Sequence, residues 1–143
     1  MIGINILFTT SETPGSQLIR AVTKEPVSHC AIQVGNYVMS AEPAGVGVMP
    51  YSLFRAHHKI KFIVPAITEQ SNLDKNFGKP YDYLGLLYLG FRYLLPSVFP
   101  KKNLWQMSGM FMCTETITDL LFEKPDDMIT PYQLYLKLTM QER

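Results

Sequence analysis

Two short stretches of the sequence carry residues that together could do nucleophilic chemistry. SHCAIQVGNYVMSAE has His29 and Glu42 at the outer ends of two apolar runs that meet at Gly35-Asn36, and FMCTETITDLLF contains Cys113. A two-residue hairpin loop at Gly35-Asn36 would place His29 directly opposite Glu42, with Cβ atoms ~4.5 to 5.5 Å apart. At that distance the carboxylate can fix the imidazole tautomer and favour its charged form. The stretch therefore predicts an oriented histidine base.

Cys113 is the candidate nucleophile for that base. We expect it at or near the start of a helix with Ile117, Leu120 and Leu121 on its buried stripe. Backbone N–H groups at a helix start favour a thiolate, and a nearby imidazolium would lower the pKa of the thiol further. Cys30 is the weaker candidate, because strand alternation points it to the apolar face, away from the neighbouring histidine. We interpret Cys30 as a packing residue.

A second histidine pair, His57-His58, could also supply a base. It stands beside Arg55 and Lys59 with no paired acid, directly before an expected strand. Adjacent basic residues of this kind are typical of a solvated turn. We therefore expect no catalytic role for this pair.

A zinc site is a further alternative, built from His29, Cys30, Cys113 and His57. Its spacing is irregular and lacks the usual ligand pair, so we expect neither a metal ion nor another cofactor. A plainer alternative stays open on spacing alone. Cys113 would then be a small core residue, and the histidine and glutamate would form a surface ion pair.

Length and composition indicate one domain, residues 1–143. The chain has 143 residues, 47% of them apolar, which suffices for one sizeable core and not for two. A formal net charge of +1 without a basic stripe argues against nucleic-acid binding. Two cysteines make no disulfide framework, so we expect a reducing compartment. The first residues lack the basic leader of a signal peptide, which predicts cytoplasmic synthesis.

The first half of the chain reads as strands with one helix between them. We expect strands at Ile2–Phe8 and in KIKFIVP, the latter closed by Pro65, and a helix capped by Ser16 and ended by Lys24-Glu25-Pro26. Gly45 and Gly47 are expected to loosen the chain after Glu42.

The second half carries apolar residues at helical spacing. Helix starts are expected at Gly78-Lys79-Pro80-Tyr81-Asp82 and at Thr130-Pro131. The apolar stretch Tyr83–Phe99 is interrupted by Arg92 and Pro96 and is too short to span a membrane, so it predicts a buried or interfacial helix. Strands followed by helices predict an α+β fold.

The order of four segments resembles the permuted papain-like cysteine hydrolases, which are related to NlpC cell-wall peptidases and to lecithin retinol acyltransferase. The resemblance covers roughly Leu18 to Leu138. The segments are LIRAVTKEPVSHCAIQVGNYVMSAE, FGKPYDYLGLL, MFMCTETITDLL and MITPYQLYLKL. It implies a circularly permuted papain-like (NlpC-like) fold, with a small antiparallel sheet packed on helices. By resemblance, Cys113 is the nucleophile, His29 the base and Glu42 the acid that orients it.

The resemblance also implies a reaction. Cys113 would attack an amide or peptide carbonyl, and His29 would protonate the leaving group and then activate water. Relatives cut bacterial cell-wall peptides, so peptidoglycan is the leading substrate. Others act on acyl lipids, and residues 83–99 would then contact a membrane surface. A third alternative is a non-enzymatic assembly subunit carried in a phage or other virus particle, since relatives occur in phages.

Overall fold

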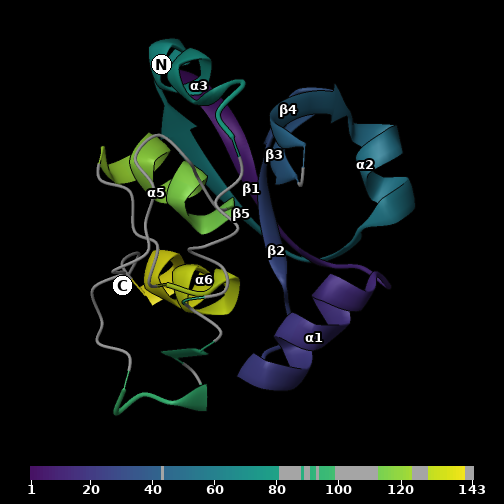
Figure 1. Cartoon of the computed structure of the whole chain (residues 1–143). Coiled ribbons are helices and arrows are strands. Elements are labelled where there is room, and N and C mark those ends of the chain that lie inside the picture. Colours follow the sequence, from purple (N-terminus) through teal and green to yellow (C-terminus); the bar gives the residue numbers. More distant parts are fainter. Residues whose placement is uncertain are drawn as a thin grey trace.

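The computed structural model describes residues 1–42, 44–80, 88, 91–92, 94–98, 113–123 and 129–140. Its strands form one antiparallel sheet in the order β4-β3-β2-β1-β5 (Figure 1). The strands are β1 (Ile2–Thr10), β2 (His29–Val34), β3 (Tyr37–Glu42), β4 (Gly45–Pro50) and β5 (Lys59–Thr68). The helices are α1 (Pro14–Thr23), α2 (Tyr51–His57), α3 (Gln70–Asn76), α5 (Cys113–Phe122) and α6 (Pro131–Met140). The predicted α+β class is therefore confirmed.

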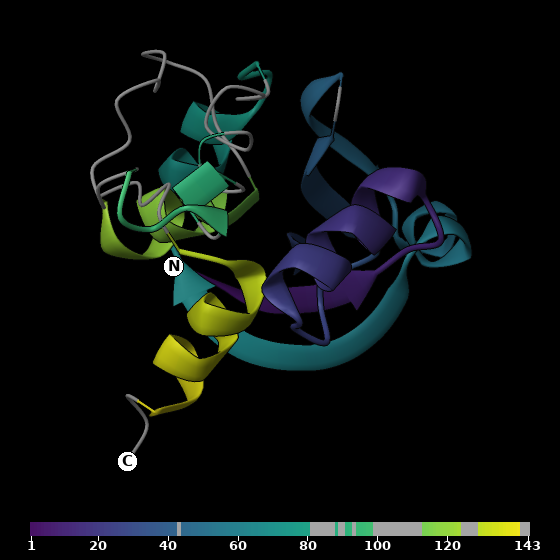
Figure 2. The same cartoon turned by 60° about the horizontal axis from the view of Figure 1, so that its bottom comes forward.

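Helices cover both faces of the sheet. α5 and α6 pack on one face, and α2 packs on the other (Figure 1 and Figure 2). The apolar core is split in the same way. Cys30, Ile32, Met39 and Ala41 belong to the cluster that includes α5, whereas Ala31 and Val38 pack with Phe54 of α2. Alternation along β2 and β3 explains this division, and the predicted apolar face of Cys30 is confirmed.

The β2–β3 hairpin turns where the sequence predicted. Gly35 has a φ of 55°, and the ladder pairs Val34 with Tyr37, Gln33 with Val38 and Ile32 with Met39. This is the expected register. In the described ladder the pairing ends at Ile32, so the predicted outer pairs, including His29 with Glu42, do not belong to it.

Two strand predictions were wrong. Gly45 and Gly47 do not loosen the chain but lie in β4, where they face Glu42 and Ser40 of β3. β5 also continues through Pro65 to Thr68. Because β5 is an edge strand of this sheet, it can accept a residue that has no N–H to donate.

The helix caps follow the sequence at one helix and depart from it at another. Thr130 caps α6 as predicted: the Gln133 N–H donates to its hydroxyl (3.2 Å) and the Gln133 side chain accepts from its N–H (3.0 Å). α1 is capped by Thr13, whose hydroxyl accepts from the N–H of Ser16. Ser16 was the predicted cap, but it lies inside α1 and bonds the Ser28 hydroxyl.

The predicted helix start at residues 78–82 is only partly within the described residues, since Tyr81 and Asp82 lie outside them. Most of the stretch Tyr83–Phe99 lies outside as well. Among the described residues, no helix is long and apolar enough to cross a membrane.

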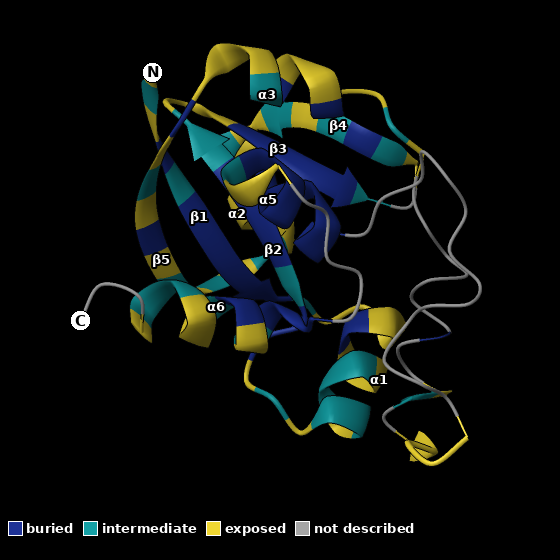
Figure 3. Cartoon of the chain, turned by 90° about the vertical axis from the view of Figure 1, so that its left-hand side faces the viewer, coloured by how far each residue is buried: buried dark blue, intermediate teal, exposed yellow. Residues whose placement is uncertain are grey.

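α5 is buried along almost its whole length, including its polar residues (Figure 3). Ile117 and Leu120 face the apolar core as predicted. On another side of the helix, Asp119 accepts a hydrogen bond from the Asn76 amide at 3.2 Å and lies 3.4 Å from the Lys75 ammonium. These bonds compensate the burial of a carboxylate and fix α5 against α3.

A close backbone contact holds the end of α3 against the sheet. The N–H of Val46 donates to the carbonyl of Lys79 at 2.7 Å, and the N–H of Gly78 donates to the carbonyl of Val46 at 2.8 Å. The adjacent Gly45 has a φ of 114°, and a Cβ there would lie 2.9 Å from the Lys79 carbonyl oxygen. Glycine is therefore required at position 45 for both conformation and space.

We expect Gly45→Ala to lower the free energy of unfolding by roughly 1–3 kcal/mol, because the variant adds both backbone strain and a steric clash. Urea denaturation measures it. Gly47→Ala is the matched control in the same strand, since a Cβ there meets nothing within 4 Å. Equal denaturation midpoints for the two variants would contradict the prediction.

Candidate active site

The His29 ring is held by a hydroxyl that bridges it to a carboxylate. His29 is the first residue of β2, and its Nε2 lies 2.7 Å from the Oγ of Ser40. Ser40 in turn donates to Oε1 of Glu42 at 2.7 Å. Since the single hydroxyl proton goes to the carboxylate, Nε2 must donate its own proton to Ser40. The bridge therefore fixes the tautomer and leaves Nδ1 of His29 available for another partner.

The structure brings His29 and Glu42 together as predicted, although not as a cross-strand pair. Their direct Nε2–Oε1 distance is 3.5 Å, longer than either bond through Ser40. Sequence reasoning missed this hydroxyl. The signal was present, because alternation places Ser40 on the same face as His29 and Glu42 and two residues before the acid.

The prediction that His57-His58 forms a solvated turn was wrong for His58. His57 is exposed, but the His58 side chain is only 13% exposed, and its Nε2 lies 3.3 Å from Oε1 of Glu42. Its ring stacks on Phe54, with centroids 4.2 Å apart, and on His29, with centroids 5.2 Å apart. The Thr9 hydroxyl lies 3.5 Å from its Nδ1. His58 is thus a second imidazole bound to the same carboxylate.

Glu42 is stabilised as a carboxylate by these partners. Burial raises its pKa, but hydrogen bonds from His58 and Ser40 and the charges of both histidines outweigh burial and lower the pKa to about 2. Its side chain keeps 29% exposure. Glu42 therefore remains negative wherever the fold persists at ordinary pH.

Cys113 is the first residue of α5 and is buried, with 7% exposure. Cys30 and His29 lie close enough to its thiol to change its pKa through hydrogen bonding. The bond from Cys30 lowers the pKa of the Cys113 thiol most, burial opposes it, and the bond and charge of His29 lower the pKa further, to well below its ordinary value. Because Nε2 of His29 is engaged by Ser40, Nδ1 is the nitrogen left for the sulfur.

The pKa of His29 changes in the opposite direction. Burial lowers it, but the hydrogen bond and charge of Cys113, together with the charge of Glu42, raise the pKa above its ordinary value. A low thiol pKa beside a high imidazole pKa favours a thiolate–imidazolium pair. Cys113, His29 and Glu42 therefore form one continuous chain of polar contacts that begins at α5 and crosses β2 to β3.

Cys30 faces the apolar core as predicted and is 1% exposed. Cys113 of α5 packs against the same face of the sheet, and the sequence did not predict this contact. Burial raises the pKa of the Cys30 thiol, and its hydrogen bond to Cys113 and the charge there raise it further. Cys30 thus stays protonated and donates to the Cys113 sulfur.

Within the described part of the chain, no group of three or more histidine, cysteine, aspartate or glutamate side chains is arranged to hold a metal ion. Of the four residues considered for zinc, His57 is exposed and takes no part in the contacts of the other three.

Two cavities lined by described residues lie beside the sheet, and the larger of them touches the site through His58. Its volume is about 620 Å³, and His58 forms part of its wall. Most of its lining residues are of polar type: Thr10, Ser11, Glu12, Tyr51, Arg55, Ala56, His57, His58, Lys59, Ile60 and Ile63.

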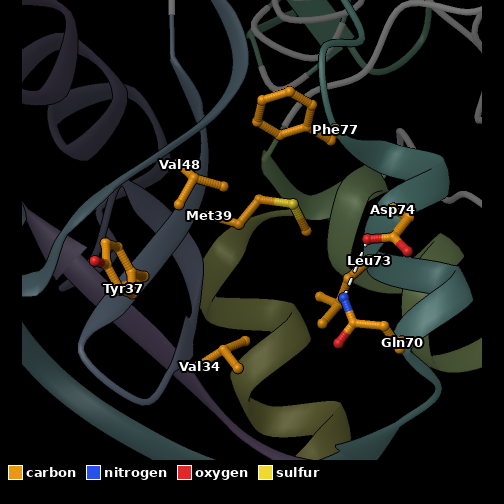
Figure 4. Close-up of a pocket in the computed structure, with 8 residues that line it drawn as sticks. All are labelled: Val34, Tyr37, Met39, Val48, Gln70, Leu73, Asp74 and Phe77. Carbon is orange, nitrogen blue, oxygen red and sulfur yellow. Dashed lines mark hydrogen bonds between the residues drawn. The ribbon is translucent and has the colours of Figure 1, made fainter.

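The smaller cavity, of about 190 Å³, lies between α3 and the turn end of β3 (Figure 4). Its lining is mostly apolar, with Met39 at the centre and Gln70 donating to Asp74 at 3.1 Å on the α3 side. None of its lining residues belongs to the chain of contacts around Glu42.

Comparisons of the chain with protein-family models, with curated proteins and with solved structures found no match. A function for this chain can therefore be inferred only from the geometry of its site.

We expect iodoacetamide to alkylate Cys113 much faster than Cys30 at neutral pH, because the Cys113 pKa is lowered and the Cys30 pKa is raised. Peptide mass spectrometry measures both rates. His29→Ala should move the pH midpoint of Cys113 alkylation upward by about one unit or more. Equal slow rates at the two cysteines of the wild type would contradict the lowered pKa.

We expect the fold to lose stability as pH falls from about 4.5 to about 2. Glu42 has a lower pKa folded than unfolded, so its contribution is complete above the unfolded value and disappears as the folded form is protonated. The loss should be roughly 2–3 kcal/mol and smaller in Glu42→Gln, as measured by urea unfolding across this pH range. Glu12→Gln, an exposed carboxylate, is the control. A variant profile identical to that of the wild type would refute the assignment.

Proposed function

We propose that this chain is a cysteine hydrolase that cleaves an amide or peptide bond through Cys113, His29 and Glu42. One observation carries the proposal: side chains from α5, β2 and β3 meet in a continuous chain of contacts that ends on a thiol with a lowered pKa. A core cysteine beside an unrelated surface ion pair does not account for that continuity. Perturbed thiol and imidazole groups in contact are typical of nucleophilic sites.

The proposed fold is the circularly permuted papain-like one. Three features support it: the histidine strand precedes the cysteine helix in the chain, the helix packs on the sheet, and the histidine uses one nitrogen for the sulfur and the other for a polar partner. The resemblance of segments described above points to the same group of hydrolases.

In the proposed reaction the Cys113 thiolate attacks the carbonyl carbon and forms a tetrahedral intermediate. The N–H of Cys113, at the first residue of α5, is the candidate donor to the oxyanion. The His29 imidazolium then gives its proton to the leaving nitrogen as the C–N bond breaks and a thioester remains. Neutral His29 takes a proton from water, the resulting hydroxide attacks the thioester, and the carboxylic acid and the Cys113 thiolate are released.

Glu42 and Ser40 act on His29 rather than on the substrate. The Ser40 bridge holds Nε2–H, so Nδ1 is the nitrogen that exchanges the proton, and the Glu42 charge stabilises the imidazolium. His58 holds the same carboxylate oxygen from the other side. These are positioning roles.

We propose a small polar amide as the substrate, with a cell-wall peptide as the first class to test. The larger cavity supports this choice, because most of its lining residues are polar and His58, which stacks on His29, forms part of its wall. A second candidate is an acyl lipid. The exposed side chains of Phe91, Leu94, Leu95 and Val98 favour it, because together they offer an apolar surface to an acyl chain or a bilayer.

Two panels of substrates are tested, peptidoglycan stem peptides and acyl-lipid amides, and mass spectrometry detects the products. We expect the wild type to cleave members of one panel. Cys113→Ala should lower the rate by at least about 10³-fold, since it removes the nucleophile. His29→Ala should have a comparable effect, and Glu42→Gln a smaller one, because Glu42 acts through the ring.

Glu69→Gln serves as the control variant, since that exposed carboxylate pairs with the Met1 ammonium and lines neither cavity. Product formation that survives Cys113→Ala would overturn the proposal. A thioester adduct on Cys113 of the wild type would support it directly, and the panel that yields it would identify the substrate class.

A further inference from the structure

Cys30 and Cys113 are two free thiols that touch inside the protein. Cys30 lies on β2 and Cys113 opens α5, which packs on β2, and both belong to the same buried cluster. Each thiol lies close enough to the other to shift its pKa. The proposed hydrolysis uses only one of them, so the second thiol has no assigned task.

An apolar residue of similar size would fill the position of Cys30 equally well. Its strand partner is Phe8, which is fully buried, and the surrounding cluster is made of aliphatic and aromatic side chains. What distinguishes a thiol there is its S–H group, which can donate a hydrogen bond to the Cys113 thiolate. Two neighbouring thiols of this kind can be joined by a disulfide when an oxidant removes two electrons.

We propose that Cys113 and Cys30 form a reversible disulfide when a hydroperoxide oxidises Cys113. Cys113 is the attacking thiolate and Cys30 is the resolving thiol. The proposal rests on the proposed function for its consequence, since the disulfide would remove the nucleophile and switch the hydrolase off. The bond formation itself needs only the two sulfurs and the hydroperoxide.

The reaction balances in two steps. The Cys113 thiolate attacks one oxygen of hydrogen peroxide, the O–O bond breaks, and the products are a sulfenic acid and hydroxide, which takes a proton to become water. The Cys30 sulfur then attacks the sulfenic sulfur, its proton leaves with the hydroxyl group as a second water, and the S–S bond forms. Two thiols lose two electrons and the peroxide gains them.

The surroundings of the two thiols determine which one is oxidised first and which one resolves the sulfenic acid. Cys113 retains slight exposure, whereas Cys30 is 1% exposed, so peroxide reaches Cys113 first. The lowered pKa of Cys113 and the raised pKa of Cys30 assign the same roles. Closing the bond requires the two sulfurs to approach to about 2 Å.

The disulfide would also protect the sulfur. A sulfenic acid that meets no thiol is oxidised further to sulfinic and sulfonic acids, which ordinary thiols do not reduce. With Cys30 in contact, the first oxidation product is captured inside the protein. A dithiol such as dithiothreitol would then restore both cysteines.

The test is treatment of the purified wild type with hydrogen peroxide, followed by non-reducing peptide mapping. We expect a cross-linked peptide pair containing Cys30 and Cys113, and a mass loss equal to two hydrogen atoms. Fast alkylation of Cys113 should disappear with peroxide and return with dithiothreitol. In Cys30→Ala, dimedone should trap the sulfenic acid, and longer exposure should add oxygens that dithiothreitol does not remove.

A wild type whose Cys113 gains two or three oxygens while Cys30 remains a free thiol would overturn the proposal. That mapping decides the question even if Cys30→Ala folds poorly. Mass and thiol reactivity are also independent of hydrolysis. A chain that forms the disulfide but cleaves no substrate would therefore refute the proposed function and leave this inference standing, and the reverse pattern would do the opposite.

Discussion

The partly buried charge of Glu42 is the constraint on which the site depends. A carboxylate removed from most of its water is stable only if donors replace that water. Ser40 comes from the same strand, His29 from the neighbouring strand and His58 from the junction of α2 and β5, and all three approach the same oxygen. The positions of three separate elements are thus tied to one atom, and the orientation of the His29 ring follows from them.

Alternation along a strand was enough to find His29 and Glu42, because both lie on one hairpin and Gly35-Asn36 predicts its turn. His58 could not be found in this way. Its position depends on how α2 connects β4, at one edge of the sheet, to β5 at the other edge. No local sequence pattern predicts the path of that connection. The contact of Cys30 with Cys113 is equally non-local, since it needs α5 to be placed on β2. Sequence spacing therefore predicted the two residues within one element pair, and the fold supplied the others.

α5 shows why a buried helix can be misread from its sequence. The expected apolar stripe predicted burial of Ile117 and Leu120, but the polar residues between them are buried as well. Asp119 is compensated by Asn76 and Lys75 of α3, and Thr118 donates to the carbonyl of Thr114 in its own helix. Such polar burial costs stability unless every group has a partner, and it is typical of helices that hold a reactive residue in one place.

The two edge strands of the sheet, β4 and β5, are protected in different ways against pairing with a strand of another molecule. At β4 the backbone of Val46 is already engaged by Gly78 and Lys79, so an incoming strand finds part of that edge occupied. At β5 the edge is interrupted by Pro65 and bears the exposed ammonium groups of Lys59 and Lys61. Missing donors and repelling charges both discourage strand addition between molecules. Pro65 was expected to end a strand. It lies inside β5 instead, where its missing N–H disfavours the addition of a strand from another molecule.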